Sequence, residues 1–139
     1  MIYITLDHLY TYAFDRSVKE STQDFDKTLE NLERDTIALI KPYLCKYYDI
    51  KKIFDPETPV RHGMLIKIIT KIILHEAISR NAYRKVSQNS KDDYDWAMAT
   101  LEKLNTGRLV LTDLPEKPKQ QNSTMGLIHG NLSNKNFYI

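Results

Sequence analysis

Cysteine, glycine and an excess of charge of one sign are all scarce in this sequence. Its 139 residues include one cysteine, Cys45, and four glycines, so we expect neither an internal disulfide framework nor a glycine-rich phosphate-binding loop. The 20 basic and 18 acidic residues leave a formal net charge of +2. A balance this close to neutral excludes the strong global field that draws a protein to nucleic acid or to an anionic membrane.

Long apolar runs are also missing. The most apolar segment, residues 64–74, contains Lys67 and Lys71 and falls short of the roughly 20 apolar residues that a transmembrane helix needs. Residues 1–14 have neither a basic start nor an unbroken apolar run, so we expect no secretory signal peptide and no membrane partner. The composition, 42% hydrophobic and 27% charged, is typical of one soluble domain made inside the cell.

The longest helical periodicity covers residues 24–48. Apolar side chains recur there at steps of three and four residues, and Ser21 or Thr22 can cap the helix. Apolar side chains nearly surround the second half, so we expect that half to be buried, with Cys45 as a small buried thiol. Because the apolar face continues beyond Pro42, we expect a kink near this residue and not the end of the helix.

Three shorter patterns predict further helices. Thr5 can cap a short helix of about two turns near the N-terminus. Residues 63–83 combine an apolar face with a polar edge and predict the core helix of the fold. Ser90 and Asp93 resemble a capping box at the start of the last helix, which Gly107 then ends in the left-handed conformation.

The remaining segments are expected to be non-helical. Residues 2–4 look extended, the prolines of residues 55–59 mark a loop, and residues 108–112 suit a short strand. From Pro115 onward the composition is polar and predicts an arm without a packed core. The predicted fold is therefore mostly α: a small bundle of about four helices over residues 1–112, with a short extended segment, followed by a flexible C-terminal arm over residues 113–139.

The sequence gives no support for catalysis or for a metal. His75 and Glu76 begin a metalloprotease pattern, but Ser79 stands where the second histidine is required. The acidic run of Asp92 and its neighbours lies at the start of a helix, where carboxylates are favoured without any ion, and it lacks the alternation of a calcium loop. Cys45 has no evident catalytic partner. We therefore expect a protein that is not an enzyme and that has no cofactor.

Two features favour binding to partners. Basic residues gather near the proline loop and near the end of the core helix, where they can contact phosphates or simply complement the helix dipole. They are Lys51, Lys52, Arg61, Arg80, Arg84 and Lys85. The nine tyrosines combine apolar area with a polar end, as protein interfaces require, although a plain core role explains about half of them. The residues expected to contact a partner are Tyr43, Tyr47, Tyr48, Arg108, Phe137, Tyr138 and Ile139.

Several segments together resemble a family of tailed-phage proteins. They are the opening YITLDHL, the helix TIALIKPYLCKYY, the loop with paired prolines, the long apolar helix and WAMATLEKLNTGRLVL, which span residues 2–111. This organisation is similar to that of the head–tail connector proteins, the head-completion adaptors that include the Mu-like prophage family.

The resemblance implies a structural virion protein of the phage neck, assembled in the bacterial cytoplasm. Such a subunit forms a ring of about twelve copies between the portal protein and a tail-side connector or terminator protein, with DNA only as passing cargo. The arm would then order on a partner, anchored by Phe137 and Tyr138. The alternative left open by the residues is a small helical regulator that binds nucleic acid through Lys51, Lys52, Arg61, Arg80 and Arg84.

Overall fold

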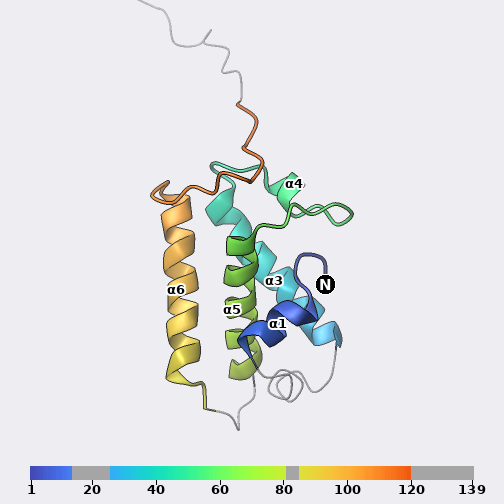
Figure 1. The fold of residues 1–139 in the computed structure, drawn as a ribbon, viewed down its shortest axis with the longest axis vertical. Helices are drawn as coiled ribbons and strands as arrows, with labels where there is room; N and C mark the ends of the chain where they lie inside the picture. Colours follow the sequence, from blue (N-terminus) through green and yellow to red (C-terminus); the bar gives the residue numbers. More distant parts are fainter. Residues whose placement is uncertain (14–25, 81–84, 120–139) are drawn as a thin grey trace, which may run out of the picture.

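The computed structural model describes residues 1–13, 26–80 and 85–119. Within these ranges the chain forms five helices and no strand. The helices are α1 (Leu6–Tyr12), α3 (Asp26–Leu44), α4 (Ile50–Ile53), α5 (Gly63–Ser79) and α6 (Gln88–Asn105). The expected mostly helical bundle is therefore confirmed (Figure 1). The predicted caps Ser21 and Thr22 lie outside the described residues.

Helix α5 is the core helix, as predicted. It packs against α1, α3 and α6, and it stands in the middle of the bundle with α6 running alongside it (Figure 1). Its isoleucines and leucines recur at steps of three and four residues over 17 residues, a length that favours a helix over a strand despite the β-branched side chains. Its fully buried apolar side chains are Leu65, Ile68, Ile69, Ile72 and Ile73.

Helix α3 lies at the outside of the bundle, and this position corrects two expectations. Only one of its faces packs against α5 and α6, so the expectation of a buried second half holds for Thr36, Ile37, Ile40 and Leu44 but is wrong for Leu39 and Pro42, which are exposed. Cys45 is likewise exposed, with its thiol donating to the carbonyl of Pro42 at 3.3 Å. The helix also ends at Leu44, two residues after Pro42, and does not continue to Tyr48 as predicted.

Residues 45–60 form a turn, a short helix and a loop. The sequence pattern did not predict α4, whose first amides are capped by the Asp49 carboxylate: Lys51 N and Lys52 N donate to it at 3.2 and 3.3 Å. The expected loop follows α4, and there the Asp55 carboxylate accepts hydrogen bonds from two backbone amides, at 2.8 and 3.0 Å. These bonds hold the pKa of Asp55 below its usual value.

The boundaries of α6 are set by one residue that the sequence indicated and one that it did not. The hydroxyl of Ser87 accepts a hydrogen bond from the amide of Ser90, so the observed cap lies three residues before the predicted one. Gly107 ends the helix region with φ of 76°, the left-handed conformation that was predicted. The strand predicted at residues 108–112 is absent, because Leu111 donates its amide to the hydroxyl of Tyr48 and has no partner strand to pair with.

The N-terminal segment is fastened to α3 by a buried carboxylate. Glu33 is 2% exposed and accepts hydrogen bonds from the amides of Ile2, Tyr3 and Ile4 at 2.6 to 2.8 Å. Thr5 then caps α1, as predicted, and its amide donates to Nδ1 of His8 at 3.0 Å. None of the helices in the described ranges is long and apolar enough to cross a membrane.

Candidate partner-binding surfaces

One end of the bundle is built by contacts between the segment after α3 and the segment after α6. Tyr48 is 4% exposed, and its hydroxyl accepts the amide of Leu111 at 2.8 Å. Asp49 donates its amide to the carbonyl of Pro115 at 2.9 Å, and Lys117 donates to the carbonyl of Tyr47 at 3.0 Å. These bonds surround a single antiparallel bridge that fixes residues 115–117 beside residues 47–49. We call this end of the molecule the tyrosine end.

A groove of about 640 Å³ opens at the tyrosine end. Tyr47 is 39% exposed and lies against Gly107, while Lys46 places its ammonium 5.0 Å from the centre of the Tyr47 ring. Val110, also in the groove wall, is 64% exposed. Lys117 and two further lysines, Lys46 and Lys119, line the groove together with Glu116. Apolar side chains beside several cations suit a partner segment that carries apolar and acidic residues.

The structure separates the predicted contact residues into different roles. Tyr47 is available at the tyrosine end, but Tyr48 is buried and holds the chain together. Tyr43 is half-buried against the core, and Arg108 is exposed without lining the groove. The predicted anchors Phe137, Tyr138 and Ile139 lie outside the described residues.

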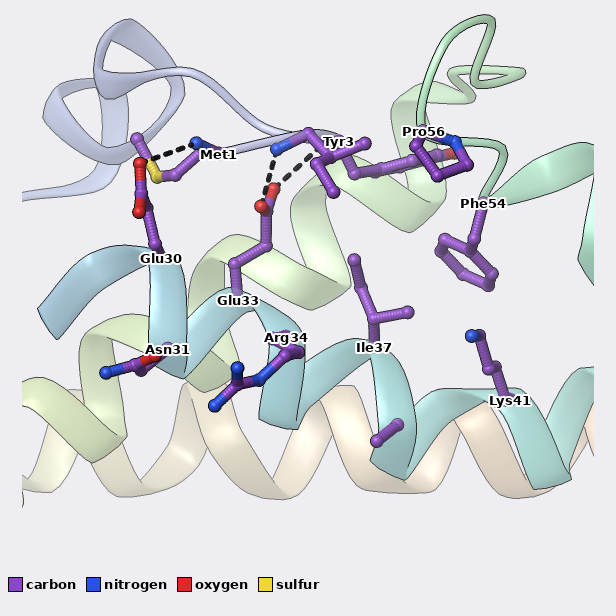
Figure 2. Close-up of a pocket in the computed structure, with 12 residues that line it drawn as sticks. Met1, Tyr3, Glu30, Asn31, Glu33, Arg34, Ile37, Lys41, Phe54 and Pro56 are labelled. Atoms are coloured by element: carbon purple, nitrogen blue, oxygen red, sulfur yellow. Dashed lines mark hydrogen bonds and ion pairs between the residues drawn. The ribbon is translucent and has the colours of Figure 1, made fainter. Parts of the chain in front are cut away.

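A second groove, of about 550 Å³, lies between α3 and the N-terminal segment. Figure 2 shows Ile37 and Lys41 rising from α3 toward the N-terminal segment and Phe54. Glu33 is fully occupied by the three amides at the back of this groove, and Glu30 pairs with the amino group of Met1 at 3.6 Å. The side chain of Lys41 has no hydrogen bond or ion pair within the described part of the chain, so this groove presents an available cation beside apolar side chains.

The side chain of Tyr3 closes the deep end of this second groove. Its hydroxyl donates to the carbonyl of Val60 at 2.9 Å and accepts the amide of His62 at 3.0 Å, and its ring lies 5.2 Å from that of Phe54. Burial raises the pKa of the Tyr3 hydroxyl, so the group is neutral and serves as a structural contact. Sequence reasoning missed the groove. The only available signal was Glu33, a charged residue at a core-facing position of a helical pattern.

The His75 and Glu76 pair lies in a shallow depression beside Ser79 and Arg80. The imidazole of His75 stacks on the Tyr94 ring with a centroid distance of 4.4 Å, and burial lowers its pKa. Burial also raises the pKa of Glu76, with Asp35 adding to the effect. The hydroxyl of Ser79 donates to the carbonyl of His75 at 2.6 Å and is therefore turned to the helix backbone. The hydroxyl of Ser79 is therefore not hydrogen-bonded to the imidazole of His75, and the two residues do not form a pair of nucleophile and base.

Metal ligands do not converge in the described residues, where no group of three or more histidine, cysteine or acidic side chains could hold an ion. The acidic run at the start of α6 is partly engaged, because Asp93 pairs with the ammonium of Lys71 on α5. Lys71 also lies 5.5 Å from the centre of the Tyr12 ring and 5.6 Å from that of Trp96, and Lys67 lies 5.0 Å from the Trp96 ring. These cations cover one side of Trp96, which is still 37% exposed.

The basic residues of the nucleic-acid alternative do not form one patch. Arg61 donates to the carbonyls of Ile2 and Tyr3 at 3.1 Å, so its guanidinium is used to hold the N-terminal segment. Arg80 lies at the other end of α5, and a helix of that length separates the two arginines by about 25 Å. Arg84 lies outside the described residues.

In comparisons with protein-family models, with curated proteins and with solved structures, the chain matches none of them.

Proposed function

We propose that the chain is a structural subunit of a tailed-phage head–tail connector, a head-completion adaptor that assembles into a ring between the portal protein and tail-side proteins. The proposal starts from the family resemblance of residues 2–111, and the helical bundle agrees with the small helical subunit that the resemblance implies. It has no catalytic role and no cofactor. DNA passes through the ring without being read, so a net charge of +2 is sufficient.

The observation that carries the proposal is the tyrosine end. Tyr47 and Val110 are exposed there beside lysines, and the described chain ends at Lys119 in the wall of the same groove. An adaptor needs a surface on which a neighbouring protein can order, and exposed apolar side chains ringed by charge serve that purpose. The polar segment 120–139 follows directly from this end and supplies further length for contact with a portal or tail-side partner.

The experiment is a measurement of the mass of the full chain in solution by light scattering, over a wide concentration range, with and without a portal protein. A closed ring, or a monomer that joins a ring when the portal is added, supports the adaptor. A chain that stays monomeric or dimeric and ignores the portal overturns it. A second arm tests the regulator: binding to duplex DNA at about 50 mM salt, weakened when Lys51 and Lys52 are replaced by Glu, would favour that alternative.

The role of the arm is tested separately. Deletion of residues 120–139 leaves every described contact of the bundle in place, including the bond from Lys117 to the carbonyl of Tyr47. We expect this shortened chain to fold as the full chain does and to lose its attachment to the portal or tail-side partner. Unchanged attachment would show that the arm takes no part in it.

A further inference from the structure

The outer face of α3 carries a heptad pattern of basic residues that the packing of the monomer does not use. The residues follow one another at alternating steps of four and three, the spacing of a coiled-coil seam. They are Lys27, Asn31, Arg34, Ala38, Lys41 and Cys45, which we call the α3 seam, and all of them are exposed. The seam contains three cations and no anion, with a small alanine at its centre.

The outer face of α6 carries the same spacing with acidic residues, two of which hold positions that cations hold in the α3 seam. Its residues again alternate in steps of four and three and are all exposed. They are Gln88, Asp92, Asp95, Ala99, Glu102 and Thr106, which we call the α6 seam. This seam contains three anions and no cation, and its centre is again an alanine. Arg34-Ala38-Lys41 on one helix therefore matches Asp95-Ala99-Glu102 on the other, position by position.

We infer that the α3 seam of one copy packs against the α6 seam of the next copy. This inference rests on the self-assembly in the proposed function and names the interface. Both helices pack into their own bundle through the opposite, buried face, so neither seam is available to the other within one copy. The contact joins two different surfaces and is heterologous, as a closed ring requires. The alanines let the helices approach closely, while Arg34 meets Asp95 and Lys41 meets Glu102.

The residues that flank the seams are complementary as well. Glu30 and Asp35 lie beside the α3 seam, and Lys91 and Lys103 lie beside the α6 seam. Flanking positions correspond to the e and g positions of a coiled coil, where charge sets the choice and orientation of the partner. Each helix therefore has flanking charges opposite in sign to those of its seam, and in the register that pairs Arg34 with Asp95, Asp35 meets Lys91.

The groove of Figure 2 fixes the direction of the two helices. It opens along one side of the α3 seam, and Asn31, Arg34, Ala38 and Lys41 of the seam line it. Trp96 lies on one side of the α6 seam. When the two helices run in the same direction, the side that carries Trp96 faces the side on which the groove opens. The uncovered side of the indole then enters the groove between Glu30 and Ile37, both of which line it.

Charge exchange tests this interface with the full chain. One variant carries Arg34→Glu and Lys41→Glu, so that both of its seams are acidic. A second carries Asp95→Lys and Glu102→Lys, so that both are basic. We expect each variant alone to need at least about tenfold higher concentration than the wild type to assemble, because like charges then face each other. A mixture of the two variants restores assembly, because each acidic seam meets a basic one. Unfolding curves check that each variant folds.

The matched control is the Lys51→Glu and Lys52→Glu variant, which reverses two exposed cations away from both seams. We expect it to assemble as the wild type does. Trp96 gives a direct signal, since it is the sole tryptophan and its emission moves to shorter wavelength when it enters the groove. If the wild type and both seam variants assemble alike, the seam contact is overturned and the ring remains. If the wild type stays monomeric even with the portal, the proposed function is overturned, and disulfide capture then decides the seam contact.

Disulfide capture uses two chains with one cysteine each. The first is the wild type, whose Cys45 ends the α3 seam and is exposed. The second carries Cys45→Ser and Thr106→Cys, which moves the cysteine to the matching position of the α6 seam. We expect a mixed disulfide dimer on mild oxidation, and none when the second chain has Glu57→Cys instead of Thr106→Cys. Absence of the dimer overturns the contact, and capture through Asp92→Cys instead of Thr106→Cys overturns the shared direction of the helices.

Discussion

Replacement of Glu33 by Ala tests the account of how the N-terminal segment is held. The carboxylate accepts the amides of Ile2, Tyr3 and Ile4, and the latter two residues are 0% and 1% exposed. A buried donor left without an acceptor costs about 1–3 kcal/mol, so two such amides predict a loss of about 2–6 kcal/mol in the free energy of unfolding. This is a large part of the roughly 5–15 kcal/mol that stabilises a domain of ordinary size.

The measurement is urea denaturation of matched variants, followed by circular dichroism. Glu33→Gln keeps one acceptor oxygen and should lose only about 1–2 kcal/mol, because its amide group faces one of the donors. Glu30→Ala is the control: the Glu30 side chain is 60% exposed and, among the described residues, pairs only with the Met1 amine, so a change of less than about 1 kcal/mol is expected. If Glu33→Ala is no more destabilising than Glu30→Ala, the Glu33 carboxylate does not hold the N-terminal segment against α3.

Three further predictions concern the tyrosine end and α5. Tyr48→Phe removes the acceptor of the buried Leu111 amide and should lower the free energy of unfolding by about 1–2 kcal/mol in urea titrations, whereas an unchanged value would mean that water replaces the hydroxyl. Gly107→Ala combines a φ of 76° with a Cβ 3.0 Å from the Tyr47 hydroxyl, and it should lower the stability by about 1–2 kcal/mol, measured by thermal melting. The pKa of His75 is lowered from 6.5 by burial, so the fold favours the neutral imidazole. The contribution of His75 to the free energy of unfolding is therefore fully present above pH 6.5. It is lost as the pH falls through the lowered pKa of His75 in the folded state. A plot of the free energy of unfolding against pH should therefore be flatter below pH 6.5 for His75→Phe than for the wild type. Identical plots for the variant and the wild type would contradict the lowered pKa of His75.

The pattern of apolar residues was sufficient to predict the helical fold, because amphipathic periodicity is a local property of the chain. The core helix, the Thr5 cap and the left-handed Gly107 could all be located from their neighbours in sequence. The last helix could also be predicted, although its start was misplaced by three residues because Ser87 and Ser90 are both good caps.

Burial and surface complementarity could not be predicted in the same way, because they depend on which faces meet after the chain has folded. Cys45 and Leu39 belong to an apolar stretch, yet they are exposed because neither the other helices nor the N-terminal segment packs over their side of α3 within the described residues. Residues 108–112 have strand-forming side chains, but the described part of the chain offers no strand to pair with, and the Leu111 amide donates to the hydroxyl of Tyr48 instead. The sequence by itself determined the helices and their polar and apolar faces. Only the tertiary structure decided which faces remain outside, because solvent exposure is set by contacts between residues far apart in the chain.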